Sequence, residues 1–371
     1  MGVCGEVAEN VLQDVRNDQF DGGGYCATLS GENMTDGRLH TAEQTMMGAV
    51  RDAILDRSVV WSFDRSGFLR HARRFRAEDV DVDLAGRVCL ITGANSGIGR
   101  AAATALASRR ADVHLLCRDR ARGEEAVNAI RRATGSNQVH LEVVDVSDLA
   151  SIRAFAERYA PPRVDVLIHN AGVLPATRQE TPEGLELTLA TNVVGPFLLT
   201  HLLRAKLAAA GGARVIFVSS GGMYARRLSL DDLQWTQRRF DGVTAYAQTK
   251  RMQVVLTEVL ARRWSRAGIA VHCMHPGWAD TPAVRSSLPR FHRLMRNRLR
   301  TPEEGADTAV WLALARAPIP SGRFWLDRAP QPTHLLPFTI EGRRDRARLW
   351  RTCERLAGVG PRSGQRGRAH G

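Results

Sequence analysis

Short apolar runs alternate with segments of helical periodicity through the middle of the chain. The runs have the length of a buried strand and are apolar on both faces. The segments between them repeat apolar positions with the period of an amphipathic helix. The predicted strands are Val88–Thr92, Val113–Leu116, Val139–Val143, Val164–Ile168, Arg214–Val218 and Ile269–Met274, and the predicted helices include Ile98–Arg109, Arg122–Ala133, Ser151–Tyr159 and Gly184–Lys206.

This alternation predicts the fold class. Strands that are buried on both faces and separated by helices indicate a parallel sheet covered on both sides. Right-handed crossovers then give a Rossmann-type, doubly wound α/β fold. We predict a seven-stranded, mostly parallel sheet with helices on both faces, in a single domain. Ligands of such folds bind at the carboxyl ends of the strands, and the motifs described below all fall there.

The regions that flank this unit have a different texture. Residues 1–55 are polar and rich in turns, and we predict a disordered extension. Residues 56–85 interleave aromatic residues with arginines, which predicts an amphipathic basic helix within 57–76. That helix either packs on the domain edge or contacts an anionic membrane surface. Residues 86–330 are the predicted dinucleotide-binding catalytic domain, and residues 331–371 a C-terminal tail with a short helix.

Composition narrows the class of protein. The chain has 371 residues, 44% of them hydrophobic, and lacks both a long apolar run and a secretory pattern at Met1. We therefore expect a cytoplasmic protein, with peripheral membrane contact as the alternative. The formal charge is +13, but only Lys206 and Lys250 are lysines and the arginines are interspersed with acids, so no specific nucleic-acid partner is predicted. The scattered cysteines lack metal-ligand spacing, and no metal is predicted.

A glycine-rich turn follows the first predicted strand. Gly93 and Gly97 stand where the backbone must turn tightly and approach a pyrophosphate, and Gly99 lets the next helix pack closely on the strand. The N-terminus of that helix offers N–H groups and a partial positive charge to phosphates. The predicted cofactor-binding residues of this turn are Gly93, Asn95, Ser96, Gly97, Ile98 and Gly99.

The end of the second strand bears on which dinucleotide binds. An acidic residue at this tip binds a ribose 2′-hydroxyl, whereas an arginine accommodates a 2′-phosphate. Arg118 therefore favours NADP(H), although the adjacent Asp119, or a purely surface role for Arg118, leaves NAD(H) open. Asp145, after the third strand, is placed to accept from the adenine amine. Asn170, Ala171 and Gly172 follow the fourth strand and are predicted to meet the ligand with their backbone.

Four residues form the predicted catalytic set. Tyr246 and Lys250 are one helical turn apart and lie on one helix face. The Lys250 ammonium should lower the pKa of the Tyr246 phenol toward neutrality, so that the phenol can act as acid and base. Ser220 ends the fifth strand and can hydrogen-bond a substrate oxygen as charge develops. Asn192 lies in a helix-forming stretch, where its side chain could hold a water that passes protons from Lys250.

Together these motifs resemble the short-chain dehydrogenase/reductase family over roughly residues 86–326. The family's cofactor motif matches Thr92–Gly99, its Asn-Ala-Gly motif matches 170–172, and its catalytic tetrad falls on the four residues just named. The resemblance also implies cofactor contacts from Pro276, Gly277 and Thr281, after the sixth strand. An inserted loop with Trp235 and Phe240 is shared with the retinol-dehydrogenase-like branch.

The resemblance implies an oxidoreductase that interconverts a carbonyl and an alcohol on a small molecule. In the reducing direction Tyr246 would protonate the oxygen while Ser220 holds it. Apolar residues of the segment after the sixth strand predict a lipophilic substrate. The alternative is a non-catalytic NADP-binding sensor or scaffold, although such proteins tend to lose the tyrosine or the lysine. The segment residues in question are Phe291, Leu294 and Met295.

Two further expectations follow from the resemblance. Relatives pair through the helix after the catalytic tyrosine, so we expect a homodimer in which this helix contributes Val254, Val255, Val259 and Leu260. The similarity to the retinol-dehydrogenase-like branch begins near Arg57. Residues 1 to about 45 are therefore expected to lie outside the natural fold, with translation starting at Met46 or Met47.

Overall fold

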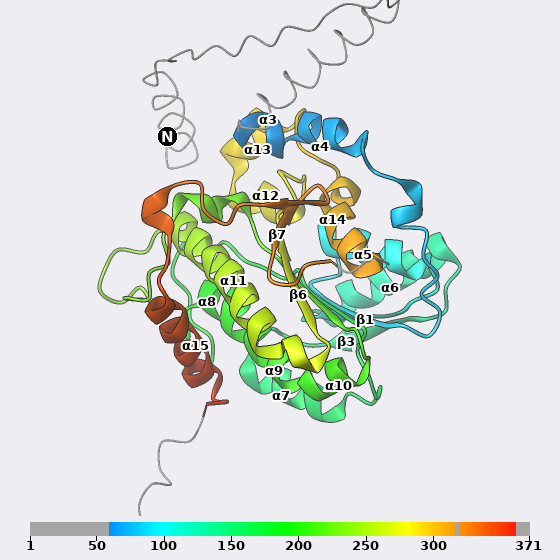
Figure 1. Ribbon diagram of the computed structural model, residues 1–371, viewed down its shortest axis with the longest axis horizontal. Helices are drawn as coiled ribbons and strands as arrows, with labels where there is room; N and C mark the ends of the chain where they lie inside the picture. Colours follow the sequence, from blue (N-terminus) through cyan, green and yellow to red (C-terminus); the bar gives the residue numbers. More distant parts are fainter. Residues whose placement is uncertain (1–58, 316–318, 361–371) are drawn as a thin grey trace, which may run out of the picture.

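An eight-stranded sheet runs through the centre of the molecule (Figure 1). Its order is β3-β2-β1-β4-β5-β6-β7-β8, parallel throughout except for the last strand, which is antiparallel to β7. The structure is a computed structural model that describes residues 59–315 and 319–360. The strands are β1 (Val88–Thr92), β2 (Asp112–Cys117), β3 (Val139–Val143), β4 (Val166–His169), β5 (Arg214–Val218), β6 (Ala270–Met274), β7 (Phe324–Leu326) and β8 (Ala329–Gln331).

The prediction of a mostly parallel α/β sheet is confirmed, and the predicted number of strands is wrong by one. The additional strand is β8, which pairs along the edge of β7. It is three residues long, and Ala329 and Pro330 are exposed. Neither its length nor its polarity marks it as a strand, because a buried strand is recognised by an apolar run. The extension expected for residues 1–55 lies outside the described residues.

Helices cover both faces of the sheet (Figure 1). Alternate residues of one strand enter different cores: Leu90 of β1 joins the core under α7, α9 and α11, whereas Cys89 and Ile91 join the core under α5, α6 and α14. The helices are α3 (Val59–Phe63), α4 (Arg65–Ala72), α5 (Gly97–Ala107), α6 (Arg120–Thr134), α7 (Leu149–Arg158), α8 (Leu187–Leu189), α9 (Gly195–Leu202), α10 (Arg204–Ala209), α11 (Gly242–Trp264), α12 (Pro282–Ser287), α13 (Pro289–Met295), α14 (Pro302–Leu314) and α15 (Arg343–Ala357).

The strand order reverses at β1, whose two neighbours are β2 and β4. The chain leaves β3 at one edge and continues as β4 on the other side of β1. Such a switch point opens a crevice at the carboxyl ends of the strands, where doubly wound folds bind ligands. The loops after β1, β4, β5 and β6 therefore hold the candidate site.

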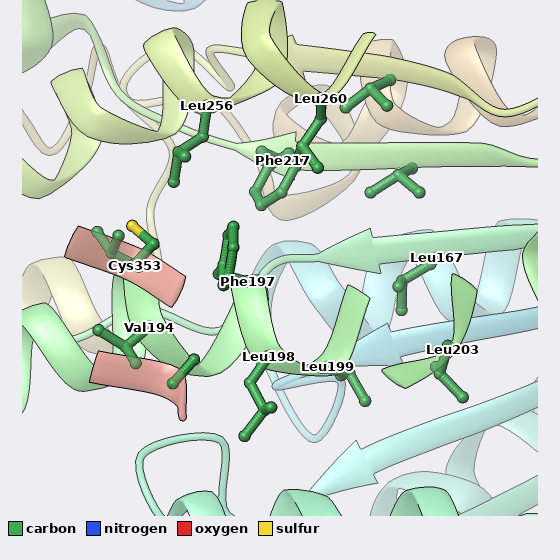
Figure 2. Packing of buried hydrophobic residues seen from close by; sticks show 14 of the residues in the cluster. Leu167, Val194, Phe197, Leu198, Leu199, Leu203, Phe217, Leu256, Leu260 and Cys353 are labelled. Atoms are coloured by element: carbon green, nitrogen blue, oxygen red, sulfur yellow. The ribbon is translucent and has the colours of Figure 1, made fainter. Parts of the chain in front are cut away.

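The long helix α11 is covered by the chain's own α15. Figure 2 shows Leu256 and Leu260 of α11, Phe197 of α9 and Cys353 of α15 around one core. The ring of Trp350 meets that of Phe197 edge-to-face, with centroids 5.0 Å apart. The homodimer prediction rested on α11 side chains that are buried inside this chain: Val254, Val255 and Leu260 are at most 2% exposed and Val259 packs against the same core.

The short helices α3 and α4 lie at the end of the molecule where the parallel strands finish, beside α13 (Figure 1). Asp64 caps α4 by accepting a hydrogen bond from the N–H of Gly67. The same carboxylate accepts from Arg298, and the N–H of Arg65 donates to the Arg298 carbonyl at 2.9 Å. The basic segment anticipated within 57–76 therefore packs on the α/β unit over its described part.

Candidate active site

The glycine-rich turn is held between two other loops. Gly93 and Gly97 have φ angles of +65° and +54°, which favour glycine. A Cβ on Gly93 would lie 3.0 Å from the Ala171 Cα, and one on Gly97 would lie 3.2 Å from the Thr281 Cγ2. Gly99 is closer still, because its Cβ would meet the Asn170 amide nitrogen at 2.4 Å. The loops after β4 and β6 thus close on this turn.

The N-terminus of α5 faces the same crevice. Its N-cap residue, Ser96, makes no side-chain capping bond, so the first N–H groups of α5 keep their capacity to bind an anion. Asn95, Ser96 and Ile98 are partly exposed around this end. A cradle that excludes side chains and a free helix N-terminus fit the pyrophosphate of a dinucleotide.

Thr92 and Cys117, at the ends of β1 and β2, support the glycine-rich turn, and the sequence analysis assigned neither of them a supporting role. The hydroxyl of Thr92 accepts from the N–H groups of Asn170 and Ala171 at 3.1 and 3.0 Å. The Asn170 amide returns bonds to the carbonyls of residues 92 and 93. Burial raises the pKa of the Cys117 thiol to about 11, and the backbone N–H groups that follow Gly93 oppose this shift. Asn170 therefore fixes the turn with its side chain.

Arg118 and Asp119, which follow β2, differ in their contacts. The Asp119 carboxylate caps α6 by accepting from the N–H of Arg122 at 2.9 Å. Arg118 is exposed at the strand end and forms no ion pair with any described residue. Asp145, beyond β3, accepts from both the N–H and the hydroxyl of Ser147 through one carboxylate oxygen. A guanidinium is thus available at this edge, whereas the adjacent carboxylate is engaged.

Ser220, Tyr246 and Lys250 come together above β5. The Ser220 hydroxyl lies near enough to the Tyr246 phenol to lower the pKa of the phenol by hydrogen bonding. The Lys250 ammonium lies 5.3 Å from the centroid of the Tyr246 ring and donates to the Val218 carbonyl at 2.8 Å. Ser219 secures the helix by donating to the Lys250 carbonyl at 3.0 Å. A phenol, a second hydroxyl and a buried amine therefore lie together near the carboxyl end of β5.

Burial shifts the pKa of Tyr246 in the direction opposite to the one predicted from the sequence. It raises the pKa of Tyr246 to about 12, and the hydrogen bond from Ser220 offsets this only in part. Burial also lowers the pKa of Lys250 to about 8. The prediction that Lys250 brings the pKa of the phenol toward neutrality is wrong, because desolvation of the phenolate raises this pKa.

The Asn192 side chain is hydrogen-bonded to two neighbouring elements. Its amide oxygen accepts from the N–H of Val173 at 3.0 Å, and its amide nitrogen donates to the Thr249 hydroxyl at 3.0 Å. Its backbone carbonyl, in the π-helical turn η2 (Ala190–Val194), accepts from Gln253 at 2.7 Å. A Cβ on Gly172 would lie 3.3 Å from this amide oxygen and 3.4 Å from the Lys250 amine. Asn192 therefore joins the β4 loop to α11.

The loop after β6 closes the opposite side. Pro276 and Gly277 are buried, and Gly277 has a φ of +71° with Arg300 packed where a Cβ would be. The Thr281 hydroxyl caps α12 by accepting from the N–H of Val284 at 3.3 Å. These residues lie against the glycine-rich turn through the Thr281 methyl group.

The predicted substrate-side residues divide into two groups. Trp235 and Phe240 pack edge-to-face at 5.4 Å in the inserted loop, and Trp278 and Phe291 do the same at 5.3 Å after β6. Leu294 is 82% exposed on α13, so it does not line an interior pocket. The four aromatic residues are therefore packed in pairs, whereas Leu294 lies at the surface.

The family assignment follows from comparison with known proteins. The family model for short chain dehydrogenase matches residues 87–290, and the chain belongs to this short-chain dehydrogenase/reductase family. It is 44% identical over 316 residues to dehydrogenase/reductase SDR family member 12 of Bos taurus, spanning 82% of this chain and 98% of that protein. It is 37% identical to retinol dehydrogenase 12 of Homo sapiens, over 77% of this chain and 92% of that protein. The predicted resemblance is confirmed.

Solved structures with nicotinamide cofactors share the fold. One is 3-ketoacyl-(acyl-carrier-protein) reductase from Brucella melitensis complexed with NADH, with 26% identity and a TM-score of 0.54 over 65% of this chain and 96% of that chain. Another is a short-chain dehydrogenase from Escherichia coli complexed with NADPH, with 25% identity and a TM-score of 0.55 over 68% of this chain and all of that chain. The family and these neighbours support a nicotinamide dinucleotide as the cofactor.

Proposed function

We propose that this chain is an NADP(H)-dependent oxidoreductase that interconverts a carbonyl and an alcohol on a small lipophilic substrate, with Tyr246 as the acid/base. The observation that carries the proposal is the cluster of Ser220, Tyr246 and Lys250 at the carboxyl edge of the sheet, next to the turn of Gly93–Gly99. Bound nicotinamide supplies or accepts the hydride. The chain's own residues have to hold the substrate oxygen and move its proton.

The acidity of the phenol favours carbonyl reduction in the proposed reaction. A phenol with a pKa of about 12 is protonated at neutral pH and is ready to donate to an oxygen that gains negative charge. The Ser220 hydroxyl stabilises the same oxygen by hydrogen bonding. The Lys250 ammonium is the nearby charge that favours the phenolate left behind, and it retains most of its charge at neutrality with a pKa of about 8.

The proposed preference for NADP(H) rests on Arg118. Its guanidinium is exposed at the end of β2, while the carboxylate of Asp119 is occupied in capping α6. A charge-assisted hydrogen bond contributes about 1.5–3 kcal/mol, so Arg118→Ala should weaken NADPH binding by roughly tenfold to a hundredfold and leave NADH binding unchanged. Fluorescence titration with each cofactor measures both affinities. Equal losses for the two cofactors would remove the basis for the preference.

The central test is a screen of lipophilic aldehydes, ketones and alcohols with each cofactor, followed by the absorbance of the reduced nicotinamide. Tyr246→Phe keeps the ring and removes the proton donor, and we expect turnover to fall by at least a hundredfold with cofactor affinity unchanged. Tyr224→Phe is the matched control, because the Tyr224 hydroxyl bonds the Pro332 carbonyl away from Ser220. A Tyr246→Phe protein with full turnover would refute the assignment of the acid.

We also propose peripheral contact of α3 and α4 with an anionic membrane surface. Trp61 and Leu69 are 44% and 51% exposed, and they line a groove with Arg70 and Arg73. Exposed apolar residues among arginines suit the interface of a bilayer with acidic headgroups. Among the described residues, no helix combines the length and the apolar composition needed to cross a bilayer.

Vesicle flotation tests this contact. We expect wild-type protein to float with phosphatidylserine-containing vesicles and not with pure phosphatidylcholine, and the double change Trp61→Ser with Leu69→Ser to abolish flotation. Flotation that is unaffected by this double change would place the contact elsewhere, and equal binding to both vesicles would refute the role of charge.

A further inference from the structure

The backbone beside the candidate catalytic serine is held by a histidine from the neighbouring strand end. The N–H of Gly221, the residue after Ser220, donates to the Nδ1 atom of His275 at 3.1 Å. Ser220 begins the short turn η3 (Gly221–Ala225), and its hydroxyl accepts from the N–H of Gly222 at 3.3 Å. The position of the hydroxyl therefore depends on the backbone that His275 fixes.

His275 can serve as a constant acceptor because it stays neutral. It is 2% exposed, and burial, together with nearby Arg300, lowers its pKa to about 3. Accepting at Nδ1 places the ring proton on Nε2, which has no hydrogen-bond partner among the described residues. The ring orientation must therefore be set by packing.

Phe63 of α3 provides that packing. Its ring meets the His275 ring edge-to-face, with centroids 4.4 Å apart. A Cβ on Gly221 would lie 2.4 Å from a Phe63 ring carbon and 2.9 Å from the His275 Nε2 atom. Histidine, phenylalanine and glycine therefore form one tight contact, and a shift of Phe63 would be transmitted to the Gly221 backbone.

A buried ion pair anchors Phe63. The Phe63 carbonyl accepts from the N–H of Trp278 at 2.8 Å and from the Arg300 guanidinium at 3.0 Å. Arg300 is also paired with both carboxylate oxygens of Asp327, at 2.6 and 2.9 Å. His71 of α4 bonds the same carboxylate at 2.6 Å. The family model begins at residue 87, so α3 and α4 lie outside the matched region although they reach the candidate site.

We infer that Phe63 and His275 are positioning residues for Ser220: the segment α3–α4, docked through Arg300 and Asp327, sets the backbone of Gly221 and thereby the hydroxyl that faces Tyr246. The inference rests on the proposed function for its kinetic consequence. Its structural content, the coupling of α3 to Ser220, is measurable without substrate.

The substrate-free measurement is the ionisation of the Tyr246 phenol. Ser220 lowers the pKa of this phenol by hydrogen bonding, so displacement of Ser220 raises it. In an ultraviolet difference titration, the absorbance at about pH 11, where roughly a tenth of a phenol with a pKa of about 12 is ionised, measures this phenolate against Tyr246→Phe in each background, and a raised pKa appears as a smaller phenolate signal. Ser220→Ala gives the full effect. We expect His275→Ala and Phe63→Leu to shift the titration in the same direction.

Two matched variants separate positioning from general damage. His275→Asn retains an acceptor near the place of Nδ1 and should restore the titration, whereas Phe75→Leu makes the same change as Phe63→Leu in the segment after α4. Phe75 contacts Phe68 and Arg328, not His275. It should leave the titration at the wild-type value.

Kinetics with any substrate found in the screen give the second readout. Small misplacement of a group that acts on the transition state costs about ten- to a hundredfold, so we expect His275→Ala and Phe63→Leu to lower kcat by that factor with unchanged affinity for NADPH. If wild-type protein turns nothing over while the titration shifts as expected, the proposed function fails and the coupling stands.

The coupling is overturned if Ser220→Ala shifts the titration while Phe63→Leu and His275→Ala do not. Should His275→Ala fail to fold, as judged by circular dichroism, Phe63→Leu and His275→Asn decide the matter. A shift in His275→Asn equal to that in Ser220→Ala would also count against the role assigned to the Nδ1 acceptor.

Discussion

The buried pair of Arg300 and Asp327 allows a stability prediction with a worked magnitude. Both side chains are at most 2% exposed, so Asp327→Asn leaves a desolvated guanidinium with its shape complement but without its countercharge. Removing one partner of a buried pair costs about 3–5 kcal/mol. Arg300 also donates to the backbone carbonyls of residues 62, 63 and 64, and these remain. We therefore expect a loss near the lower limit, about 3 kcal/mol.

Urea unfolding followed by tryptophan fluorescence measures this loss. In thermal unfolding, the same change of about 3 kcal/mol lowers Tm by about 4–5 °C in a chain of this size. Asp83→Asn is the control, because the Asp83 pair with Arg110 is exposed, and we expect no measurable change. An Asp327→Asn protein as stable as wild type would refute the view that this pair docks α3 and α4.

The pH dependence of stability provides a second test of the Asp327→Asn prediction. Burial by itself raises the pKa of Asp327, but the hydrogen bonds and charges of His71 and Arg300 outweigh burial and hold it below the ordinary value of 3.8. A carboxyl whose pKa is lowered on folding stabilises the protein above its unfolded pKa and loses that contribution as the pH falls through the folded pKa. The gap between wild type and Asp327→Asn should therefore be full at neutrality and shrink below about pH 4.

Three further predictions concern the site and the core. With a Lys250 pKa of about 8, kcat for reduction should fall as the pH rises through that value, and Lys250→Arg should move the fall to higher pH in a pH–rate profile. Gly97→Ala and Gly135→Ala should each lower the free energy of unfolding by about 1–2 kcal/mol, measured by thermal unfolding, because both positions need a positive φ. Only Gly97→Ala should weaken NADPH binding, since nothing lies within 4 Å of a Cβ on Gly135. Trp350→Ala should cost about 3–5 kcal/mol by leaving a cavity between α15 and α9, measured by urea unfolding, and an unchanged midpoint would contradict the packing described.

Local sequence patterns were sufficient to predict the sheet and the edge of the sheet that holds the candidate site. The apolar runs predicted β1 to β6 to within two residues, and all of these strands except the edge strand β3 are largely buried on both faces. The placement of Ser220 and Gly93 on one edge followed from the parallel arrangement, since carboxyl ends of parallel strands meet there. β8 escaped prediction because a three-residue edge strand with Ala329 and Pro330 exposed has no apolar signature.

Contacts between distant segments were beyond the reach of periodicity and spacing. Phe63 and His275 are more than two hundred positions apart, and nothing local to either indicates their ring contact. The acidity of Tyr246 shows the same limit. Spacing located the Lys250 ammonium correctly on the adjacent helical turn, but the sign of the pKa shift depends on how much water the phenol loses, which only the packed structure reveals.

The position of α15 has a consequence for synthesis of the protein. During translation α9 and α11 are synthesised long before Trp350 and Cys353. The apolar surface of α9 and α11 that α15 covers therefore remains exposed to water until α15 has left the ribosome. A message cut short before Arg343 would yield chains with that surface exposed, prone to aggregate and dependent on chaperones. The core around α9 and α11 is therefore complete only after α15 has been synthesised.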